Sequence, residues 1–374
     1  MKFYILNNGL LSSEGMSGSD QRALHWSKAF VSKGHCVTMV VPEEARERYQ
    51  EFDCLITDKS RNRTSLFTIC VYLRRAFKAA FLLSKKLKDE RQSNIVIYSS
   101  SDLLPDAIPA IFNKIIKQSY TWIAGLHLIA PNPLKGFRKI ATEGFCVPSI
   151  VNIYYFLTQR CIQFFMRRYA HTVMVSNSLD KEFLLNRGFS AKQVIVTYGA
   201  VDWDNINAAH KGPEGYSACY VGRFHKQKGF YDLIQAWKDV CRCLPAAVLA
   251  VIGTDTNLNE MIKKVKSENL SDNIKFLGFL SGVAKYNQMK SAKLCVFPST
   301  YESFGMVVAE AFACGLPVVA YDLPIYNEIY PRGMLKAKIG EIGELTKQTL
   351  NLLLDDNLRE GLSQQAYEVG KAFT

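Results

Sequence analysis

The chain has 374 residues, which is too long for one ordinary hydrophobic core, so two domains are expected. Its 48% hydrophobic and 21% charged residues are typical of a globular protein and exclude a disordered or fibrous chain. No run of about 18 apolar residues occurs, which argues against a membrane-spanning helix. The ten cysteines show neither metal-binding spacing nor a disulfide framework, so we expect reduced thiols and a cytoplasmic location.

The net charge of +12 lies almost entirely in the first half of the chain. Residues 1–202 carry 27 Lys and Arg against 16 Asp and Glu, a balance of +11, whereas the remainder carries 19 against 18, or +1. A basic half calls for an acidic partner, either nucleic acid or an anionic membrane. The sequence shows no zinc finger or RNA-binding signature, so we discount nucleic acid.

Short apolar runs suited to buried parallel strands alternate with helical patterns along the chain. The expected strands are 3–6, 36–41, 94–99, 121–126, 171–176, 193–197, 218–221, 248–253, 274–277, 294–297 and 317–320. The expected helices include 19–30, 230–241, 257–269, 283–291 and 305–314. This alternation predicts an α/β fold with two doubly wound, Rossmann-like domains, 1–202 and 203–374, with a polar linker at 203–215. Ligands would bind at the carboxyl ends of the strands, in a central cleft between the domains.

The segment 301–319 reads Y-E-S-F-G-M-V-V-A-E-A-F-A-C-G-L-P-V-V, with two glutamates framing an apolar helix. Glu310 lies within that helix, where an unpaired carboxylate would be costly. Glu302 lies where Ser303, Phe304 and Gly305 would open the helix, at an end that attracts phosphate. Either glutamate alone is more often a structural acid or a cap. Together they suit a sugar nucleotide, whose hydroxyls need acceptors and whose diphosphate needs donors.

A second motif, V-G-R-F-H-K-Q-K-G at 221–229, follows the first expected strand of the second half. Gly222 allows a close turn, and Arg223 and Lys228 place two cations near a strand end, where they could hold phosphate oxygens. Taken alone, such a run is more often a solvated basic loop. Near the N-terminus, the small-residue loop 14–20 contains Gly18 and Ser19, which could approach a phosphate or an acceptor closely.

These motifs resemble those of the retaining glycosyltransferases of family 4 (glycosyl transferases group 1), which have the GT-B fold. The family has two glutamates eight positions apart followed by A-x-G-x-P-V, and a G-R-x(4)-K-G element whose Arg and Lys neutralise the donor diphosphate. His127 aligns with a family histidine that contacts the donor sugar, although a lone histidine is as often structural. Gly278-Phe279-Leu280 is similar to the segment whose backbone holds the nucleotide base. One departure is Ser17, which replaces the first of two family glycines.

The resemblance implies a hexosyltransferase-like enzyme that moves a sugar from a nucleoside diphosphate sugar to an acceptor hydroxyl, in polysaccharide or glycolipid synthesis of the cell envelope. It implies catalytic roles for Glu302 and His127. The donor-binding residues that it implies are Gly18, Ser19, Gly222, Arg223, Lys228, Leu280, Glu302, Ser303, Phe304, Gly305, Met306 and Glu310. The alternative is a non-catalytic sugar-nucleotide-binding or scaffold protein, which the weakened glycine loop permits. An epimerase acting on the free nucleotide sugar is a third option.

No metal and no cofactor are expected. Asp202-Trp203-Asp204 formally spells the D-x-D with which metal-dependent glycosyltransferases of the other major fold hold a divalent ion. Its place at the domain junction favours a structural turn instead.

Two helical segments could explain the basic first half. Residues 66–88 form an apolar pattern interrupted by cations, namely Arg74, Arg75, Lys78, Lys85, Lys86 and Lys88. This segment could equally lie on an anionic membrane or cover the core. Residues 154–168 carry aromatic residues and three arginines, and here we favour a core helix. A peripheral place on the inner face of a membrane is therefore one expectation for the chain.

Overall fold

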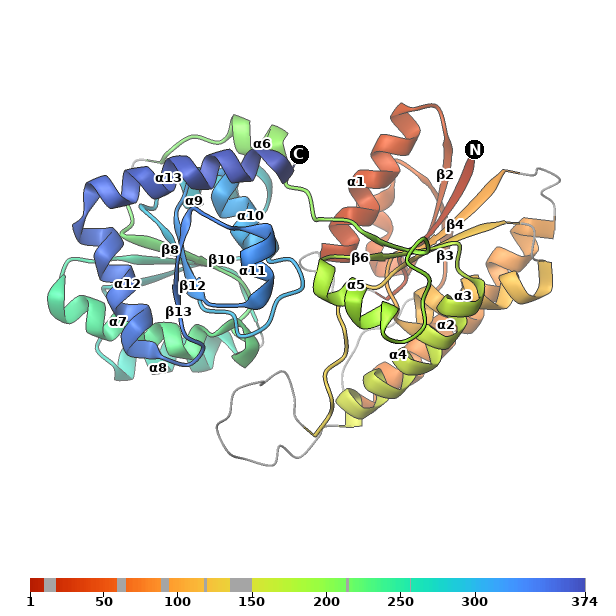
Figure 1. Ribbon diagram of the computed structural model, residues 1–374, viewed down its shortest axis with the longest axis horizontal. Helices are drawn as coiled ribbons and strands as arrows, with labels where there is room; N and C mark the ends of the chain where they lie inside the picture. The colour runs from red at the N-terminus through yellow and green to blue at the C-terminus, as the bar shows by residue number, and fades with distance from the viewer. Residues whose placement is uncertain are drawn as a thin grey trace. The chain divides into compact units, whose positions relative to one another are not determined.

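The computed structural model describes residues 1–9, 18–58, 65–88, 94–117, 120–134, 150–212, 215–255 and 257–373. The chain divides into two compact units, Met1–Tyr198 and Gly199–Thr374. Each unit is built around a parallel sheet covered by helices, as Figure 1 shows. The predicted α/β class with two doubly wound domains is therefore confirmed.

The sheet of the first unit has the strand order β3-β2-β1-β4-β5-β6-β7, and all its pairings are parallel. Its strands are β1 (Lys2–Leu6), β2 (Cys36–Val41), β3 (Asp53–Ile56), β4 (Ile95–Ser99), β5 (Thr121–Gly125), β6 (Thr172–Val175) and β7 (Val194–Val196). Side chains of β1 alternate between two faces, as a strand requires. Phe3 and Ile5 join one core cluster, whereas Tyr4 and Leu6 join the other.

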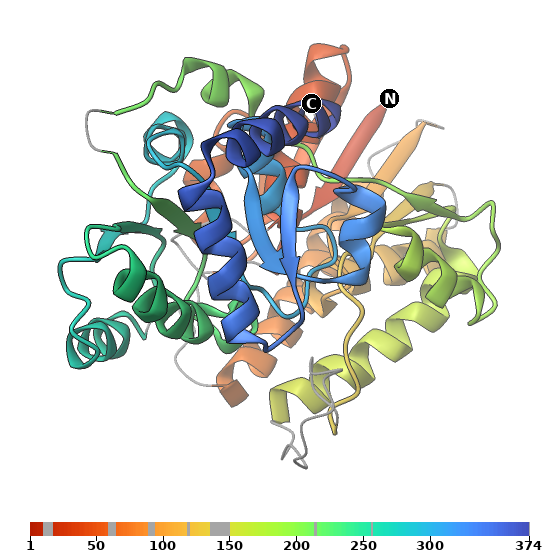
Figure 2. The same cartoon turned by 60° about the vertical axis from the view of Figure 1, so that its left-hand side comes forward.

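The helices of the first unit are α1 (Gly18–Ser32), η1 (Glu43–Tyr49), α2 (Ser65–Lys88), α3 (Leu104–Lys117), α4 (Ile150–Tyr169) and α5 (Ser178–Leu185). Helices α2, α3 and α4 pack against one another on one face of the sheet (Figures 1 and 2). Their inner faces bury residues such as Leu83 and Met166 in the core shared with Tyr4 and Leu6. Their outer faces carry exposed apolar side chains, such as Phe77 of α2 and Leu157 of α4.

The second unit has the strand order β10-β9-β8-β11-β12-β13, again with parallel pairings. Its strands are β8 (Ala218–Val221), β9 (Leu249–Ile252), β10 (Ile274–Gly278), β11 (Cys295–Phe297), β12 (Val318–Tyr321) and β13 (Met334–Ala337). Its helices are α6 (Trp203–Ala208), η2 (Lys226–Lys228), α7 (Phe230–Cys243), α8 (Leu258–Ser267), α9 (Gly282–Lys290), α10 (Met306–Ala313), α11 (Pro324–Ile329), α12 (Ile342–Leu354), α13 (Asp356–Gly370) and η3 (Lys371–Phe373). In each unit, β1 or β8 lies at the point where the strand order reverses, the usual place for a ligand in such sheets.

Helix α10 is apolar on all sides apart from the carboxylate of Glu310, and this apolar character fits its position, because residues 308–313 are all buried. Small residues such as Ala309 and Ala313 let other elements approach its backbone closely. A Cβ at Gly370 of α13 would lie 2.7 Å from the Ala313 nitrogen, so only glycine fits at this helix crossing. The helix of the 301–319 motif therefore packs closely against α13.

The expected strands and helices are observed within two residues of their predicted bounds, except that the helix expected at 154–168 begins at Ile150. Strands β3 and β13 and helices α3, α5, α11, α12 and α13 were not predicted. The stretch predicted as a polar linker, 203–215, was partly wrong because it begins with helix α6. Asp202 caps that helix and Ile206 is buried in the core of the second unit. None of the helices in the described ranges has the length and apolar character needed to cross a bilayer.

Candidate functional site

Three neighbouring strands of the second unit have a glycine at their carboxyl end: Gly222 directly follows β8, Gly253 directly follows β9, and Gly278 is the last residue of β10. Gly253 donates a hydrogen bond to the Gly278 carbonyl at 2.8 Å, and a Cβ at position 253 would lie 2.1 Å from the Gly222 oxygen. All three have positive φ angles, which glycine alone adopts readily. The three glycines therefore leave a bare edge, where the backbone carries no side chains of its own and where ligands of such sheets usually bind.

The loop after β8 places Arg223 at this bare edge. The Arg223 side chain is exposed, and its carbonyl accepts a hydrogen bond of 2.9 Å from the Tyr220 hydroxyl. Gly229 ends the loop with φ +68°, and a Cβ there would lie 1.9 Å from the Pro298 oxygen. The loop backbone is thus fixed at both ends while the guanidinium remains available to an anion.

A second set of hydrogen bonds ties this loop to the segment after β11. The Gln227 carbonyl accepts from the Thr300 nitrogen at 2.8 Å, and the Gln227 side chain donates to the Tyr301 carbonyl at 2.9 Å. The two sequence motifs, 74 residues apart at Lys228 and Glu302, are therefore parts of one site in the second unit.

Lys228 and Glu302 form an ion pair with Nζ and Oε1 2.5 Å apart. Their side chains are only 22% and 11% exposed, so solvent screens this pair less than a surface pair. Ammonium has three donors, so Lys228 can hold Glu302 and a phosphate oxygen together. The pair keeps a cation and an acceptor side by side without leaving either charge buried alone.

The start of α10 lies directly after Glu302. Gly305 has φ +86° as the N-cap, and its carbonyl accepts a hydrogen bond of 3.1 Å from the Tyr330 hydroxyl. The first backbone N–H groups of a helix have no acceptors within the helix. The N–H groups of Gly305 and Met306 are therefore placed to donate hydrogen bonds to an anion. Phe304 differs, because its ring is buried against Phe373 and Tyr330. Only the backbone of Phe304 can serve a ligand.

Glu310, the buried carboxylate of α10, is paired with a residue that the sequence did not reveal. Lys285 of α9 places Nζ 2.7 Å from Glu310 Oε1, and the Tyr286 hydroxyl lies 3.4 Å from the same oxygen. Both charged side chains are nearly buried, at 12% and 6% exposed. Burial and the neighbouring Glu310 raise the pKa of Tyr286 far above its usual value, so its hydroxyl stays protonated and able to donate.

The predicted residue Leu280 follows β10 and packs, half-buried, against the core of the second unit. Its neighbour Phe279 is 49% exposed. Strand β10, which precedes Leu280, is two strands away from β8 in the sheet order. Ser303 is half-buried between Glu302 and the α10 N-cap.

The first unit holds the remaining predicted residues, Gly18, Ser19 and His127. Gly18 and Ser19 open α1, and the loop before them, including Ser17, lies outside the described residues. One turn further along α1, Arg22 places Nη1 2.5 Å from Nδ1 and 2.8 Å from Nε2 of His127. Burial, followed by the Arg22 charge, lowers the pKa of His127 well below its usual value. His127 is therefore a neutral ring, and Arg22 is a contact that its position in the sequence did not indicate.

A buried polar cluster in the first unit was also not foreseen. Asp106 accepts hydrogen bonds from the Asn8 nitrogen at 2.6 Å and from the Ser101 hydroxyl at 2.5 Å. Burial is the main cause that raises the pKa of Asp106 to about 7, and the charge of Asp20 adds to it. Burial likewise raises the pKa of Asp102 to about 6. Asp102 follows β4, and Asp106 lies in the first turn of α3.

Asp202 has a structural role, since its carboxylate accepts from the Asn205 nitrogen at 3.1 Å and from the Asn205 side chain at 2.6 Å. Within the described part of the chain, no three His, Cys, Asp or Glu side chains lie close enough to hold a metal ion.

Comparison with known proteins places the second unit in a family. Residues 202–369 match the sequence profile of Glycosyl transferases group 1. The phosphatidyl-myo-inositol mannosyltransferase of Mycobacterium leprae is 31% identical over 42% of this chain and 44% of its own length. The N-acetyl-alpha-D-glucosaminyl L-malate synthase of Bacillus anthracis is 27% identical over 40% and 39%. The chain thus spans less than half of the length of these two relatives.

Solved structures are similar over the whole chain. Sucrose-phosphate synthase from Thermosynechococcus elongatus superimposes with a TM-score of 0.74 at 16% identity, covering 100% of this chain and 94% of its own. Anabaena HepE in complex with UDP and glucose gives 0.73 at 16% identity, covering 100% and 95%. Residues 202–369 therefore form a Glycosyl transferases group 1 domain, and the chain has the GT-B fold of two Rossmann-like domains.

Proposed function

We propose that this protein is a retaining glycosyltransferase of family 4, which moves a sugar from a nucleoside diphosphate sugar to an acceptor hydroxyl. The observation that carries the proposal is the meeting of Arg223, the Lys228–Glu302 pair and the start of α10 at one strand edge of the matched domain. Cations and helix N–H groups suit a diphosphate, and carboxylates suit sugar hydroxyls. Relatives named for glycolipid and polysaccharide synthesis support the same class.

The contacts described above support the following residue roles in this proposal. Arg223, Lys228 and the amides of Gly305 and Met306 bind the diphosphate. Glu302 accepts from sugar hydroxyls while Lys228 holds its other side, and Glu310, oriented by Lys285, accepts from the ribose. Gly222 and Leu280 contact the nucleotide, and Gly18, Ser19 and the neutral ring of His127 keep the roles that the family resemblance implies.

Retention without a protein nucleophile requires departure and attack on the same face of the sugar. The leaving diphosphate, held by Arg223 and Lys228, takes the proton of the incoming hydroxyl. Catalysis then depends on positioning and on stabilisation of the charge that develops on the leaving group. Neither a metal ion nor a cofactor takes part in this scheme.

Turnover of labelled nucleotide sugars in the presence of a membrane extract tests the proposal. A screen by thermal shift first identifies which nucleotide sugar the protein binds. Transfer of label into an acceptor with retained anomeric configuration is expected. Binding without turnover would establish a non-catalytic sugar-nucleotide-binding protein, and an altered free nucleotide sugar would establish an epimerase.

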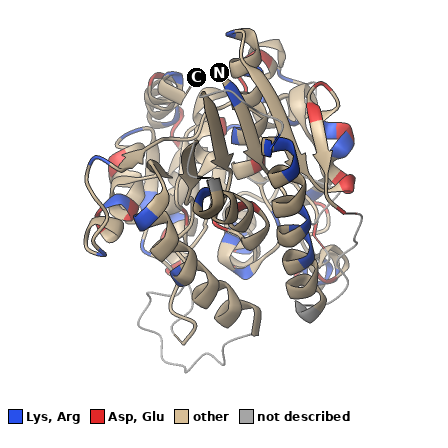
Figure 3. Ribbon diagram, turned by 90° about the vertical axis from the view of Figure 1, so that its right-hand side faces the viewer, with Lys and Arg blue, Asp and Glu red and all other residues tan. Residues whose placement is uncertain are grey.

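We also propose that the first unit attaches to anionic membranes through α2. This helix has no acidic residue, and its exposed side carries Phe77 and Phe81 at 66% and 68% exposure beside Lys78 and Lys85. Figure 3 shows Lys and Arg segments recurring along the helices of this unit. Three members of the predicted cluster have acidic partners. Arg75 is fully buried and paired with Glu44 at 2.9 Å. Arg74 is paired with Asp58 at 3.0 Å and Lys86 with Asp53 at 3.9 Å.

Sedimentation with vesicles tests the attachment. Binding to vesicles that contain phosphatidylglycerol should exceed binding to phosphatidylcholine alone and should fall at high salt. Phe77→Ser with Phe81→Ser should release the protein, whereas the matched change at Phe112 of α3 should release it less. Equal binding to both lipids, or none, would show that the charge serves another purpose.

A further inference from the structure

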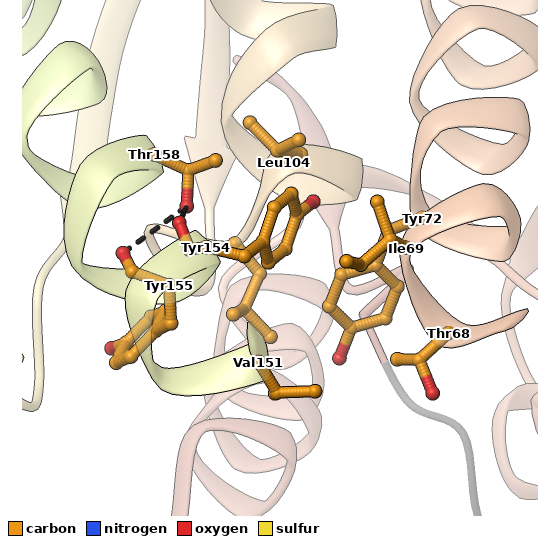
Figure 4. Close-up of a pocket in the computed structure, with 9 residues that line it drawn as sticks. Thr68, Ile69, Tyr72, Leu104, Val151, Tyr154, Tyr155 and Thr158 are labelled. Carbon is orange, nitrogen blue, oxygen red and sulfur yellow. Dashed lines mark hydrogen bonds between the residues drawn. The ribbon is translucent and has the colours of Figure 1, made fainter. Parts of the chain in front are cut away.

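The first unit contains a small pocket between α2, α3 and α4 that none of the proposed roles uses. Its volume is about 140 Å³, and Figure 4 shows Tyr154 reaching from α4 toward Leu104 and the side chains of α2. The lining residues are Thr68, Ile69, Tyr72, Leu103, Leu104, Val151, Tyr154, Tyr155 and Thr158. The lining is mostly apolar, and a cavity of this size is comparable to one that holds benzene, or about six carbon atoms.

One polar atom of the described lining, the Tyr154 hydroxyl oxygen, differs from the others in its hydrogen bonding. The Thr158 hydroxyl donates to the Tyr154 carbonyl, as the dashed line in Figure 4 shows, and the Tyr72 hydroxyl donates to the Gly9 carbonyl at 3.0 Å. The Tyr155 hydroxyl donates to the Leu128 carbonyl at 3.3 Å. The Tyr154 hydroxyl is buried and has no hydrogen-bond partner among the described residues. An unmet buried donor is costly, which points to an acceptor supplied from outside.

Water and polar ligands fit this pocket poorly. A buried water needs two to four polar partners, and the described lining offers it one unpaired donor, the Tyr154 hydroxyl, beside hydroxyls that already donate elsewhere. A sugar or nucleotide carries several polar groups that would each need a partner. A hydrocarbon chain with one acceptor oxygen near it satisfies both the apolar walls and the Tyr154 donor.

The outer faces of the same helices indicate where such a chain comes from. Helix α4 carries an exposed stripe at i, i+3 and i+4 spacing, made by Ile150, Ile153, Leu157 and Phe164, and contains no acidic residue. This exposed stripe corrects the expectation that 154–168 is only a core helix. With the Phe and Lys side chains of α2, the two helices that wall the pocket both present apolar and cationic groups, which complement an anionic lipid surface.

We propose that this pocket binds one acyl chain of a glycerolipid, with the Tyr154 hydroxyl donating to its ester carbonyl. About six chain carbons fit, so the pocket takes a segment of one chain and not a whole lipid. An isoprenoid phosphate carries several charged oxygens at the chain end, which need more donors than the single Tyr154 hydroxyl. The acyl chain belongs either to a bilayer lipid or to a glycolipid acceptor, and in the second case the inference rests on the proposed transferase function.

The test uses dihexanoyl phosphatidylcholine below its micelle concentration and its dihexyl ether analogue, which lacks the carbonyl. Calorimetric titration without nucleotide sugar should show saturable binding of the ester, and about 3- to 10-fold weaker binding of the ether because one hydrogen bond is lost. Tyr154→Phe should bind both probes equally weakly. Tyr155→Phe, the matched control one residue away, should keep the preference for the ester.

Val151→Trp, which fills the pocket, should abolish binding of both probes. No saturable binding, no preference for the ester, or unchanged binding by the tryptophan variant would each overturn the proposal. Because these titrations need no sugar donor, their result is independent of whether the protein proves to be a transferase.

Two further measurements on Val151→Trp distinguish an acyl chain of the acceptor from an acyl chain of a bilayer lipid. If the chain belongs to the acceptor, Val151→Trp lowers label transfer into lipid while vesicle sedimentation is unchanged. If the chain belongs to a bilayer lipid, sedimentation falls as well.

Discussion

The two units share a doubly wound parallel topology yet use their charged residues in opposite ways. In the second unit, two partly buried lysines are paired with carboxylates, in Lys228–Glu302 and Lys285–Glu310, and the net charge is close to zero. In the first unit, Lys78 and Lys85 lie exposed on a helix without acidic residues, beside exposed Phe81. The shared topology therefore does not determine what each unit binds. The placement of charged side chains decides whether a unit suits a small anion or an extended anionic surface.

The largest effect is expected from breaking the charged edge of the second unit. Arg223→Ala and Glu310→Gln should each reduce sugar transfer by at least about a hundredfold, as when one positioned charge contact is removed. Arg242→Ala, which removes an exposed arginine paired with Asp239 in the same unit, should leave transfer unchanged. Steady-state kinetics with folded variants provide the measurement. Near-normal rates for both site variants would refute the donor assignment.

The bare glycine edge gives the next largest effect, on stability. Gly253→Ala puts a Cβ against the Gly222 oxygen at a φ of +147°, which should destabilise the second unit by about 2–5 kcal/mol. Gly343→Ala in α12 has open space around the new Cβ and should be neutral or stabilise by up to about 1 kcal/mol. Denaturant unfolding compares the two. Equal stability of both variants would mean that the strand ends are not in contact.

The buried acids of the first unit predict that its stability depends on pH. The folded pKa of Asp106 is raised to about 7, so its contribution is complete below about pH 4 and is lost as the pH rises to 7. A difference of one between the folded and the unfolded pKa corresponds to about 1.4 kcal/mol of unfolding free energy. Asp106→Asn should flatten the fall in unfolding free energy between pH 5 and 7, while exposed Asp53→Asn should not. A parallel pH profile in the Asp106 variant would contradict the assignment.

The smallest effect is expected from removing metal ions. Because Asp202 caps α6 with both carboxylate oxygens, a chelator should leave the rate of transfer unchanged. Transfer rates with and without chelator, followed by added manganese or magnesium, provide the measurement. Strict dependence on added metal would instead make Asp202 and Asp204 candidate ligands.

The sequence was sufficient for the strand pattern and for the motifs around Glu302 and Lys228, because both depend on short-range periodicity and spacing. It was insufficient for the partners of those residues. Lys285 reaches Glu310 from another helix, and Arg22 reaches His127 from 105 residues away, contacts that only the packing of elements defines. The exposed stripe of α4 was also missed, because an apolar periodicity looks the same whether it faces a core or a bilayer.

Gly199 gives the second unit a mechanical property. A Cβ at this first residue of the unit would lie 2.5 Å from Met306 Sδ and 2.6 Å from Phe304 Cε1, so the incoming chain rests directly on the segment that opens α10. Two residues later, the Val201 nitrogen donates to the Phe373 carbonyl at 2.8 Å. A ligand that displaces the start of α10 must therefore also displace the main chain at Gly199, which is bonded to residue 198, the last residue of the first unit.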